Sequence, residues 1–184
     1  MKALLAIILL ASSALAQGDH ITDKAKGEIA GAVAACGPEE TKFDLKTSNA
    51  EHSVAQPEAG KALFYVIGQD GTQQDILCKG CEIVARVGLN GDWIGAVNGN
   101  SFLSSSVAPG EYHLCTQWQS RFSIRSKRLA LANFTAEASK IYYFRMRLTR
   151  QGNHAPLLDL EEINSDEGKY LVLTSQISTS HSQK

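Results

Sequence analysis

The chain has 184 residues, of which 43% are hydrophobic, so it is long enough to bury the core of one domain and short for two. Its 18 Lys and Arg residues against 19 Asp and Glu give a formal net charge of −1 at pH 7, which excludes a strongly basic or acidic chain. This charge balance by itself neither supports nor excludes binding to nucleic acid. We predict no nucleic-acid partner. Four cysteines are few for this length, so disulfides would support the fold rather than replace its core.

The first sixteen residues have the pattern of a secretory signal peptide. Lys2 supplies a positive charge, an apolar run begins at Ala3, and the small residues Ala14 and Ala16 precede a predicted cleavage before Gln17. The apolar run is about 14 residues long, whereas a bilayer-spanning helix needs about 20. We therefore predict a signal peptide at 1–16 and an exported protein that is periplasmic or secreted after cleavage.

Residues 17–60 are predicted to be a polar N-terminal extension. The stretch from 36 to 60 is mostly polar and contains Pro38, Pro57 and Gly60, which are typical of loops. Within it, Thr41–Leu45 is predicted to be a short edge strand.

Short strands separated by turns are predicted from residue 61 onward. The dense apolar run Lys61–Ile67 is typical of a central strand. Asn90-Gly91, between apolar runs at Glu82–Leu89 and Asp92–Val97, is a strong hairpin signal because both central residues must take positive φ. The remaining predicted strands are Ser101–Val107, Glu111–Gln119, Leu129–Thr135, Ile141–Thr149 and Leu157–Glu162.

A short helix is predicted near the C-terminus. Asn164 is a favourable N-cap residue and Glu167 lies three residues after it. Tyr170, Leu173 and Ile177 recur at helical spacing, so we place the helix at about 165–178 and expect a frayed tail after it. These elements predict a mainly β domain at 61–184, an antiparallel β-sandwich of about seven strands with a short C-terminal helix.

Three segments in the middle of the chain resemble those of a known family. They are NGDWIG from Asn90, PGEYH from Pro109 and ASKIYYF from Ala138. Over about residues 61–150 the chain resembles the exported bacterial family called domain of unknown function 2846, with a core similar to PEGA-type domains. Asp92 and Ser139 stand where the family usually has Lys and Gly. The resemblance implies a small β-sandwich in a bacterial envelope and no known activity.

The cysteines are candidate disulfide partners, because export places them in an oxidising compartment. Cys36, Cys78, Cys81 and Cys115 allow three connectivities, and the sequence alone does not choose among them. We favour Cys78–Cys81 with Cys36–Cys115, because Gly80 permits a tight loop. In the alternative, Cys78 and Cys81 form a thiol–disulfide redox site, although a strand-like run rather than a helix follows them.

Basic residues cluster between 121 and 150, where we count eight against one acid. Arg145 and Arg147 alternate onto one strand face, and Arg125 and Arg128 precede the neighbouring strand. This cluster is either a solvated strand face or a site for an anionic envelope component, such as an acidic glycan, a lipid headgroup or an acidic protein.

The motifs of common enzyme classes are missing from the sequence. It contains no G-x-S-x-G elbow, P-loop, dinucleotide fingerprint or paired histidines at metal-binding spacing, and we expect no cofactor. We predict a non-enzymatic binding or scaffolding module of the envelope. The alternatives are a redox protein and a glycan or anionic-ligand domain that uses the basic face. A further alternative is a ligand platform of Trp93, Tyr112, Trp118 and Tyr142, although Tyr112 and Trp118 share an apolar face.

Overall fold

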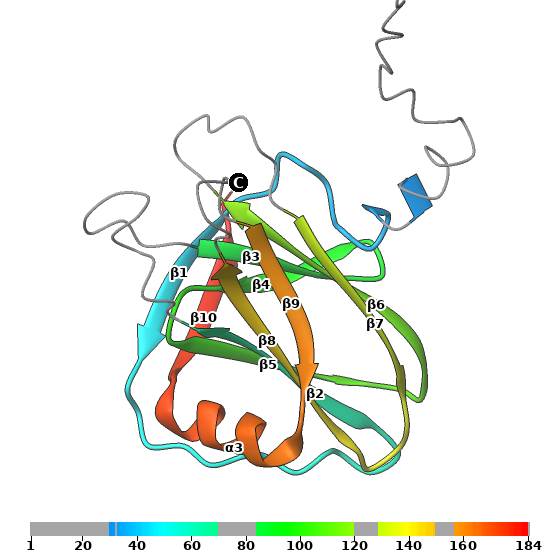
Figure 1. Ribbon diagram of the computed structural model, residues 1–184, viewed down its shortest axis with the longest axis vertical. Helices are drawn as coiled ribbons and strands as arrows, with labels where there is room; N and C mark the ends of the chain where they lie inside the picture. Colours follow the sequence, from blue (N-terminus) through cyan, green and yellow to red (C-terminus); the bar gives the residue numbers. More distant parts are fainter. Residues whose placement is uncertain (1–29, 32, 70–83, 120–128, 150–156, 184) are drawn as a thin grey trace, which may run out of the picture.

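The computed structural model describes residues 30–31, 33–69, 84–119, 129–149 and 157–183 (Figure 1). These residues contain ten strands and one helix, joined by loops. The strands are β1 (Phe43–Ser48), β2 (Ala62–Gln69), β3 (Val84–Leu89), β4 (Asp92–Val97), β5 (Ser101–Val107), β6 (Gly110–Gln119), β7 (Leu129–Ala136), β8 (Ile141–Thr149), β9 (Leu157–Ile163) and β10 (Gln176–Ser182), and the helix is α3 (Ser165–Thr174).

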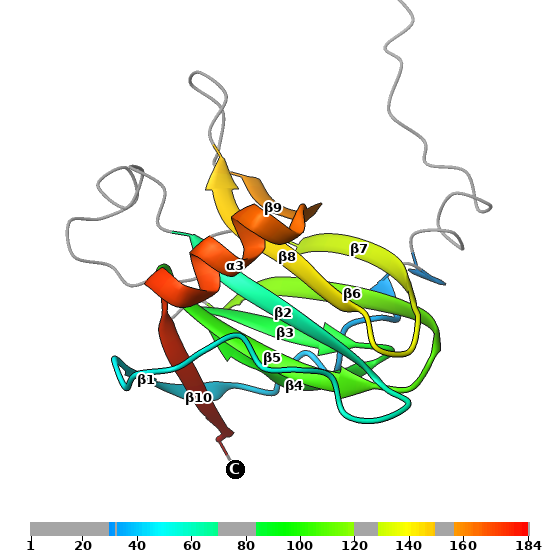
Figure 2. The same cartoon turned by 90° about the horizontal axis from the view of Figure 1, so that it is seen from below.

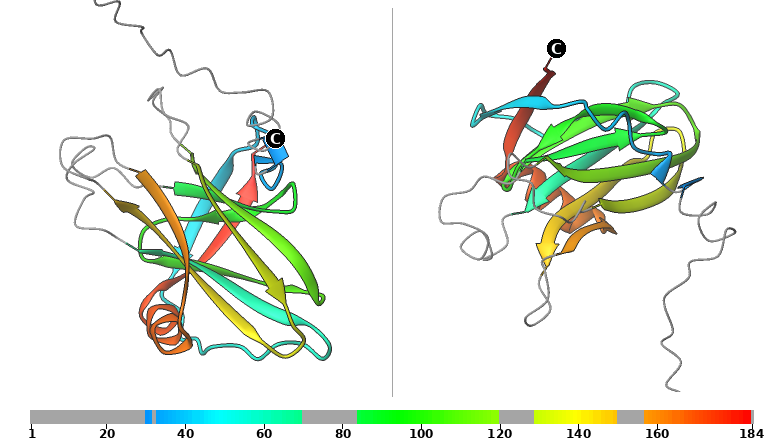
Figure 3. Two further views of the ribbon diagram at one scale, coloured as in Figure 1. Left: turned by 45° about the vertical axis from the view of Figure 1, so that its right-hand side comes forward. Right: turned by 90° about the horizontal axis from the view of Figure 1, so that it is seen from above.

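The strands form two sheets. A six-stranded sheet has the order β1-β10-β5-β2-β8-β9, and a four-stranded sheet has the order β4-β3-β6-β7. Neighbours are antiparallel except for β2 with β8 and β10 with β5, which are parallel. The two sheets approach each other at both edges, because β7 contacts β9 on one side and β10 contacts β4 on the other. Figure 3 shows β1 and β10 side by side at that second edge.

The main core lies between the two sheets. Along β2, Phe64 and Val66 point into it, and they meet Val87 of β3, Leu114 of β6 and Phe144 of β8, all fully buried. The predicted apolar faces of β6 and β8 are the faces that enter this core. Strand periodicity therefore assigned these side chains correctly, because an alternating strand in a two-sheet fold buries one face.

A second, smaller core lies on the other face of the six-stranded sheet, under α3. Tyr65 and Ile67 of β2 enter it together with Tyr143 of β8 and Val172 of the helix. Gly168 makes the close approach possible, since a Cβ at this position would lie 2.2 Å from Cγ of Tyr143. Figure 2 shows α3 lying across this outer face. Burial on both faces explains why β2 reads as a continuous apolar run.

The predicted Asn90-Gly91 hairpin is confirmed. Asn90 has φ 49° and Gly91 has φ 98°, so both central residues take positive φ as a two-residue hairpin requires. The backbone N–H of His113 also donates to Oδ1 of Asn90 at 2.8 Å, which ties the turn to β6. In the turn after β7, Ser139 has φ 65°, which lies in the left-handed region that favours glycine.

The start of the predicted helix is confirmed and its end is wrong. The side chain of Asn164 accepts hydrogen bonds from the backbone N–H groups of Asp166 and Glu167, and α3 begins at Ser165. The helix ends at Thr174, four residues early, and the chain continues as β10 rather than as a frayed tail. The expected apolar face is also wrong, because Tyr170 and Leu173 are exposed, whereas Gly168 and Val172 are buried.

The mainly β class is confirmed, but the predicted count and pairing are wrong. Ten strands rather than about seven are present in the described residues, and two pairings are parallel. Strand β1 lies within the predicted extension, where Thr41–Leu45 was predicted to be an edge strand, and it pairs with the unpredicted strand β10 over six residue pairs. Strand β10 is polar and has no alternating apolar pattern, so no strand could be predicted there from the sequence. The described residues include no helix long and apolar enough to cross a bilayer.

His52 joins the loop after β1 to the helix. Its Nδ1 lies 2.9 Å from the carbonyl oxygen of Ala50, and its Nε2 lies 2.8 Å from that of Val172. Only the doubly protonated imidazolium can donate to both oxygens. The hydrogen bonds to Val172 and to Ala50 therefore raise the pKa of His52 above its ordinary value, against a smaller opposing effect of burial.

We predict that His52 makes the stability of the protein depend on pH. Because the folded pKa exceeds the unfolded value, the stabilisation is fully present below the unfolded pKa of about 6.5 and is lost as pH rises through the folded pKa. Urea unfolding at about pH 5.5 and about pH 8.5 measures this loss. The variant His52→Gln should lose less stability over this range than wild type, whereas His181→Gln should match wild type. If the free energy of unfolding changes equally between the two pH values for His52→Gln and for wild type, His52 is not the cause of the pH dependence.

Candidate functional site

The predicted Cys36–Cys115 disulfide is confirmed. The two Cα atoms are 5.2 Å apart, and the bond joins residues separated by 79 positions. Cys115 is fully buried on β6, on the face of the four-stranded sheet opposite the core. The bond therefore fastens the segment before β1 to the outside of this sheet. Cys78 and Cys81 lie outside the described residues, so their pairing stays a prediction.

We call residues 35–43 the strap, because this segment runs over the outer face of the four-stranded sheet. The backbone N–H of Gly91 donates to the carbonyl oxygen of Ala35 at 3.0 Å. Farther along, the indole N–H of Trp93 donates to the carbonyl oxygen of Pro38 at 2.7 Å. At the end of the strap, the side-chain amide of Gln119 makes two hydrogen bonds to the backbone of Phe43.

Arg86 lies beneath the strap and is 5% exposed. Its guanidinium donates to the carbonyl oxygens of Glu39, at 2.8 Å, and Thr41, and to Oε1 of Gln117. Its Cζ also lies 4.3 Å from the ring centroid of Trp93, a cation–π contact. Burial lowers the pKa of Arg86, and the charge of Glu39 opposes that shift. Both terminal nitrogens of the guanidinium donate to groups of the fold, whereas its buried Nε has no hydrogen-bond partner among the described residues. We therefore assign Arg86 a structural role.

Two of the four candidate anion-binding arginines lie together and are paired with acids. Arg145 pairs with Glu161 of β9 and Glu167 of α3, and its side chain is 15% exposed. Arg147 pairs with Asp159 at 3.3 Å and with Glu161 at 3.1 Å. The hydrogen bond from Arg145 lowers the pKa of Glu161, which keeps this carboxylate charged.

These ion pairs neutralise the described part of the basic cluster. Arg145 and Arg147 share one strand face, as predicted, but register places the acids of β9 directly opposite them. Arg125 and Arg128 lie outside the described residues. Anion binding by the four arginines thus stays a prediction. The ion pairs of Arg145 and Arg147 argue against it, because these two charges already have acidic partners.

The four aromatic candidates do not form a common platform. Tyr112, Trp118 and Tyr142 pack against the main core, whereas Trp93 lies on the opposite side of the four-stranded sheet under the strap. Their side chains are therefore used for packing.

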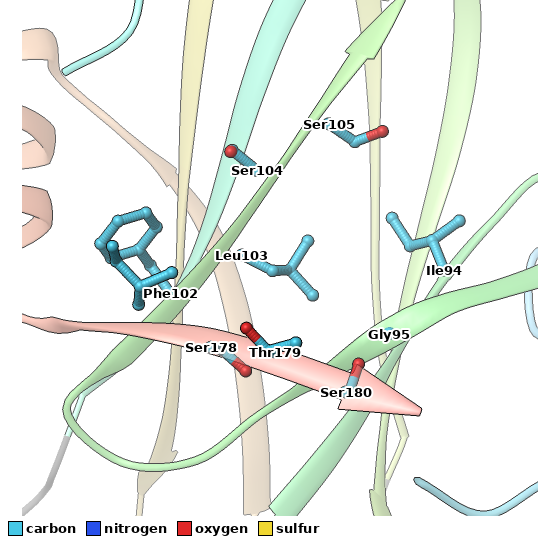
Figure 4. Close-up of a pocket in the computed structure, with 10 residues that line it drawn as sticks. Ile94, Gly95, Phe102, Leu103, Ser104, Ser105, Ser178, Thr179 and Ser180 are labelled. Atoms are coloured by element: carbon cyan, nitrogen blue, oxygen red, sulfur yellow. The ribbon is translucent and has the colours of Figure 1, made fainter. Parts of the chain in front are cut away.

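A groove lies at the edge where the two sheets approach each other, between β4, β5 and β10 (Figure 4). It has a volume of about 300 Å³. Leu103 and Ser105 of β5 point into it toward Ile94 of β4, and β10 crosses its lower end. The residues that line it are Ile94, Gly95, Phe102, Leu103, Ser104, Ser105, Ile177, Ser178, Thr179 and Ser180.

The lining combines hydroxyl groups with aliphatic side chains and carries no charged residue. Among the described lining residues, no His, Asp, Glu or Lys accompanies the serines, so none of them has a base within the lining to activate it. The described residues also contain no cluster of His, Cys, Asp or Glu arranged to hold a metal ion. A neutral, partly apolar groove is suited to hold an uncharged ligand.

This groove was not among the sites predicted from the sequence. Three consecutive serines in β5 and the run Ser178-Thr179-Ser180 were the available signals, since hydroxyl-rich stretches are unusual in strands that only fill a core. No signal placed the two runs next to each other, because they are more than seventy residues apart in the chain.

No family model, curated protein or solved structure gives a significant match to this chain.

We predict that the disulfide contributes strongly to stability. Replacing both Cys36 and Cys115 by alanine removes a cross-link across 79 positions, which should cost about 4 kcal/mol in the free energy of unfolding. Urea unfolding of the purified protein measures the loss. The double variant Cys78→Ala/Cys81→Ala is the matched control, because a ring between cysteines three positions apart restrains the unfolded chain far less. A larger loss in the control would contradict the prediction.

We also predict that Arg86 is needed for stability rather than for binding. Arg86→Met keeps most of the side-chain volume but leaves the acceptors on Glu39, Thr41 and Gln117 without their donor, which should cost about 3 kcal/mol. Arg147→Met is the matched control, and it should cost less than about 1 kcal/mol because the side chains of its ion pairs are over a third exposed to solvent. Thermal and urea unfolding give both values, and similar costs would argue against a structural role.

Proposed function

We propose that this protein is an exported, non-enzymatic binding module and that the groove between β4, β5 and β10 is its binding site. The groove carries the proposal, since it is a recess of about 300 Å³ with neutral polar groups around aliphatic side chains. Such a combination provides apolar contact area and a few hydrogen-bonding groups that orient a ligand.

Export is supported by two independent features. The first sixteen residues have the charge and apolar pattern of a signal peptide. The Cys36–Cys115 bond agrees with an oxidising compartment, where such bonds persist. The resemblance to the exported family of domain of unknown function 2846 points the same way. It also favours describing the two facing sheets as a β-sandwich of the PEGA-like kind.

A binding role is better supported than the two alternatives. The thiol–disulfide hypothesis depends on Cys78 and Cys81, and no described residue supports it. The anionic-ligand hypothesis depends in part on Arg145 and Arg147, whose charges are already met by Glu161, Glu167 and Asp159.

The binding role can be tested with two uncharged probes, maltose and a capped peptide of about seven alternating threonine and valine residues. Each is titrated into the isotope-labelled mature protein while backbone amide signals are recorded by NMR. We expect at least one probe to shift the signals of Gly95, Leu103 and Ser180 in a saturable way. If neither probe changes the groove signals, the proposed function is wrong.

Two tryptophan variants serve as matched controls. Ser105→Trp places a large side chain in the groove and should abolish binding of the active probe. Ser106→Trp changes the next residue of the same strand, which lies on the opposite face and outside the lining, and should leave binding intact. Equal binding by wild type and both variants would place the ligand elsewhere and overturn the proposal.

A further inference from the structure

We propose that the ligand of this groove is an extended, uncharged peptide segment of a partner protein, which adds as a strand to the free edge of β5. The inference rests on the proposed binding role of the groove and specifies the partner's chemistry. It depends on the backbone of β5, on the path of β10 and on the neutral lining.

The edge of β5 that faces the groove is largely unpaired. On its other edge β5 pairs with β2 along its whole length, from Ser101 to Val107. Toward the groove it pairs with β10 only at Ser101 and Phe102. From Leu103 to Val107 no described strand pairs with this edge, and alternate residues of a strand direct their N–H and C=O groups away from the first neighbour. An unpaired edge of this kind is a template for another strand.

The path of β10 leaves this edge open. After Ile177, β10 turns away from β5 and crosses to β4 of the other sheet. There the hydroxyl of Ser178 donates to the carbonyl oxygen of Ala96 at 2.6 Å, and the backbone N–H of Ala96 donates to Oγ of Ser180 at 3.1 Å. These two bonds anchor β10 on β4, so β5 and β10 diverge and the groove opens between them, as Figure 4 shows.

The open edge has the length and surroundings that an added strand needs. Five residues of β5 extend about 16 Å, enough to pair with about five residues of a guest. Small side chains lie along the edge, among them Ser104 and Ser105, so another backbone can approach it closely. Gly95 instead packs against the fold itself, since a Cβ there would come within 2.9 Å of Oγ of Ser180 and 3.3 Å of Cδ2 of Leu103.

The lining specifies the guest's side chains. Because no lining residue is charged, a charged inward side chain would lose hydration without gaining a partner. Inward positions of the guest would meet Leu103 and Ile94, which favour small aliphatic groups. The guest would also continue a ladder that Gln176 and Ile177 of β10 have already begun on this edge. A peptide fits these features better than a sugar, because a row of backbone groups along a strand is met best by another backbone.

The peptide arm of the titration tests this inference. We expect the capped threonine–valine peptide to bind and to slow amide hydrogen exchange between Leu103 and Val107 by at least about tenfold, because added strands protect the N–H groups they bond. The same peptide with N-methyl groups on its central residues cannot donate from those residues, and its affinity should fall at least about tenfold. Ser105→Trp should block binding, whereas Ser106→Trp should not.

The outcomes separate this inference from the binding role itself. If maltose occupies the groove and the peptide does not, the binding role stands and the peptide inference is wrong. If the peptide binds but N-methylation leaves its affinity unchanged, strand addition is wrong. If the amides of Leu103–Val107 become protected with rising protein concentration alone, and sedimentation velocity shows a dimer, a second copy occupies the edge and the peptide partner is overturned.

Discussion

The fold depends on the fact that β2 buries side chains on both of its faces. Phe64 and Val66 enter the core between the sheets, while Tyr65 and Ile67 enter the smaller core under α3. Burial on both faces is typical of a strand in the interior of a sheet, and β2 is paired with β5 on one edge and with β8 on the other. The six-stranded sheet is thus built outward from β2, and the helix is required to cover the second core.

The open edge follows from this arrangement. Covering the second core places the end of α3 near the start of β5, so the chain leaving the helix at Ser175 meets β5 at once. The same chain also pairs with β1 and bonds to Ala96 of β4. The same residues of β10 cannot both pair with β5 and bond to β4. Strand β10 therefore leaves β5, and the groove forms between the two strands. The candidate binding site is therefore a consequence of how the fold closes its edge.

The disulfide and the buried or paired arginines lie on the outer faces of the two sheets, away from the groove. The strap, fastened by the Cys36–Cys115 bond, covers Arg86 on the four-stranded sheet, and the acids of β9 and α3 meet Arg145 on the six-stranded sheet. Both arginines are occupied by partners within the fold. The groove is separate from these charged contacts and has no charged residue in its lining. An uncharged partner therefore suits it.

The sequence by itself determined the local features of this protein. Alternation and turn residues predicted most strands within two residues of their ends, the Asn90-Gly91 hairpin and the N-cap at Asn164, because each depends on neighbours in the chain. Only the tertiary structure decided which strands pair in parallel, which acids meet Arg145, and that the polar segment after α3 becomes β10. These outcomes depend on contacts between residues far apart in sequence, and the groove depends on them most, since β5 and β10 meet only in the folded chain.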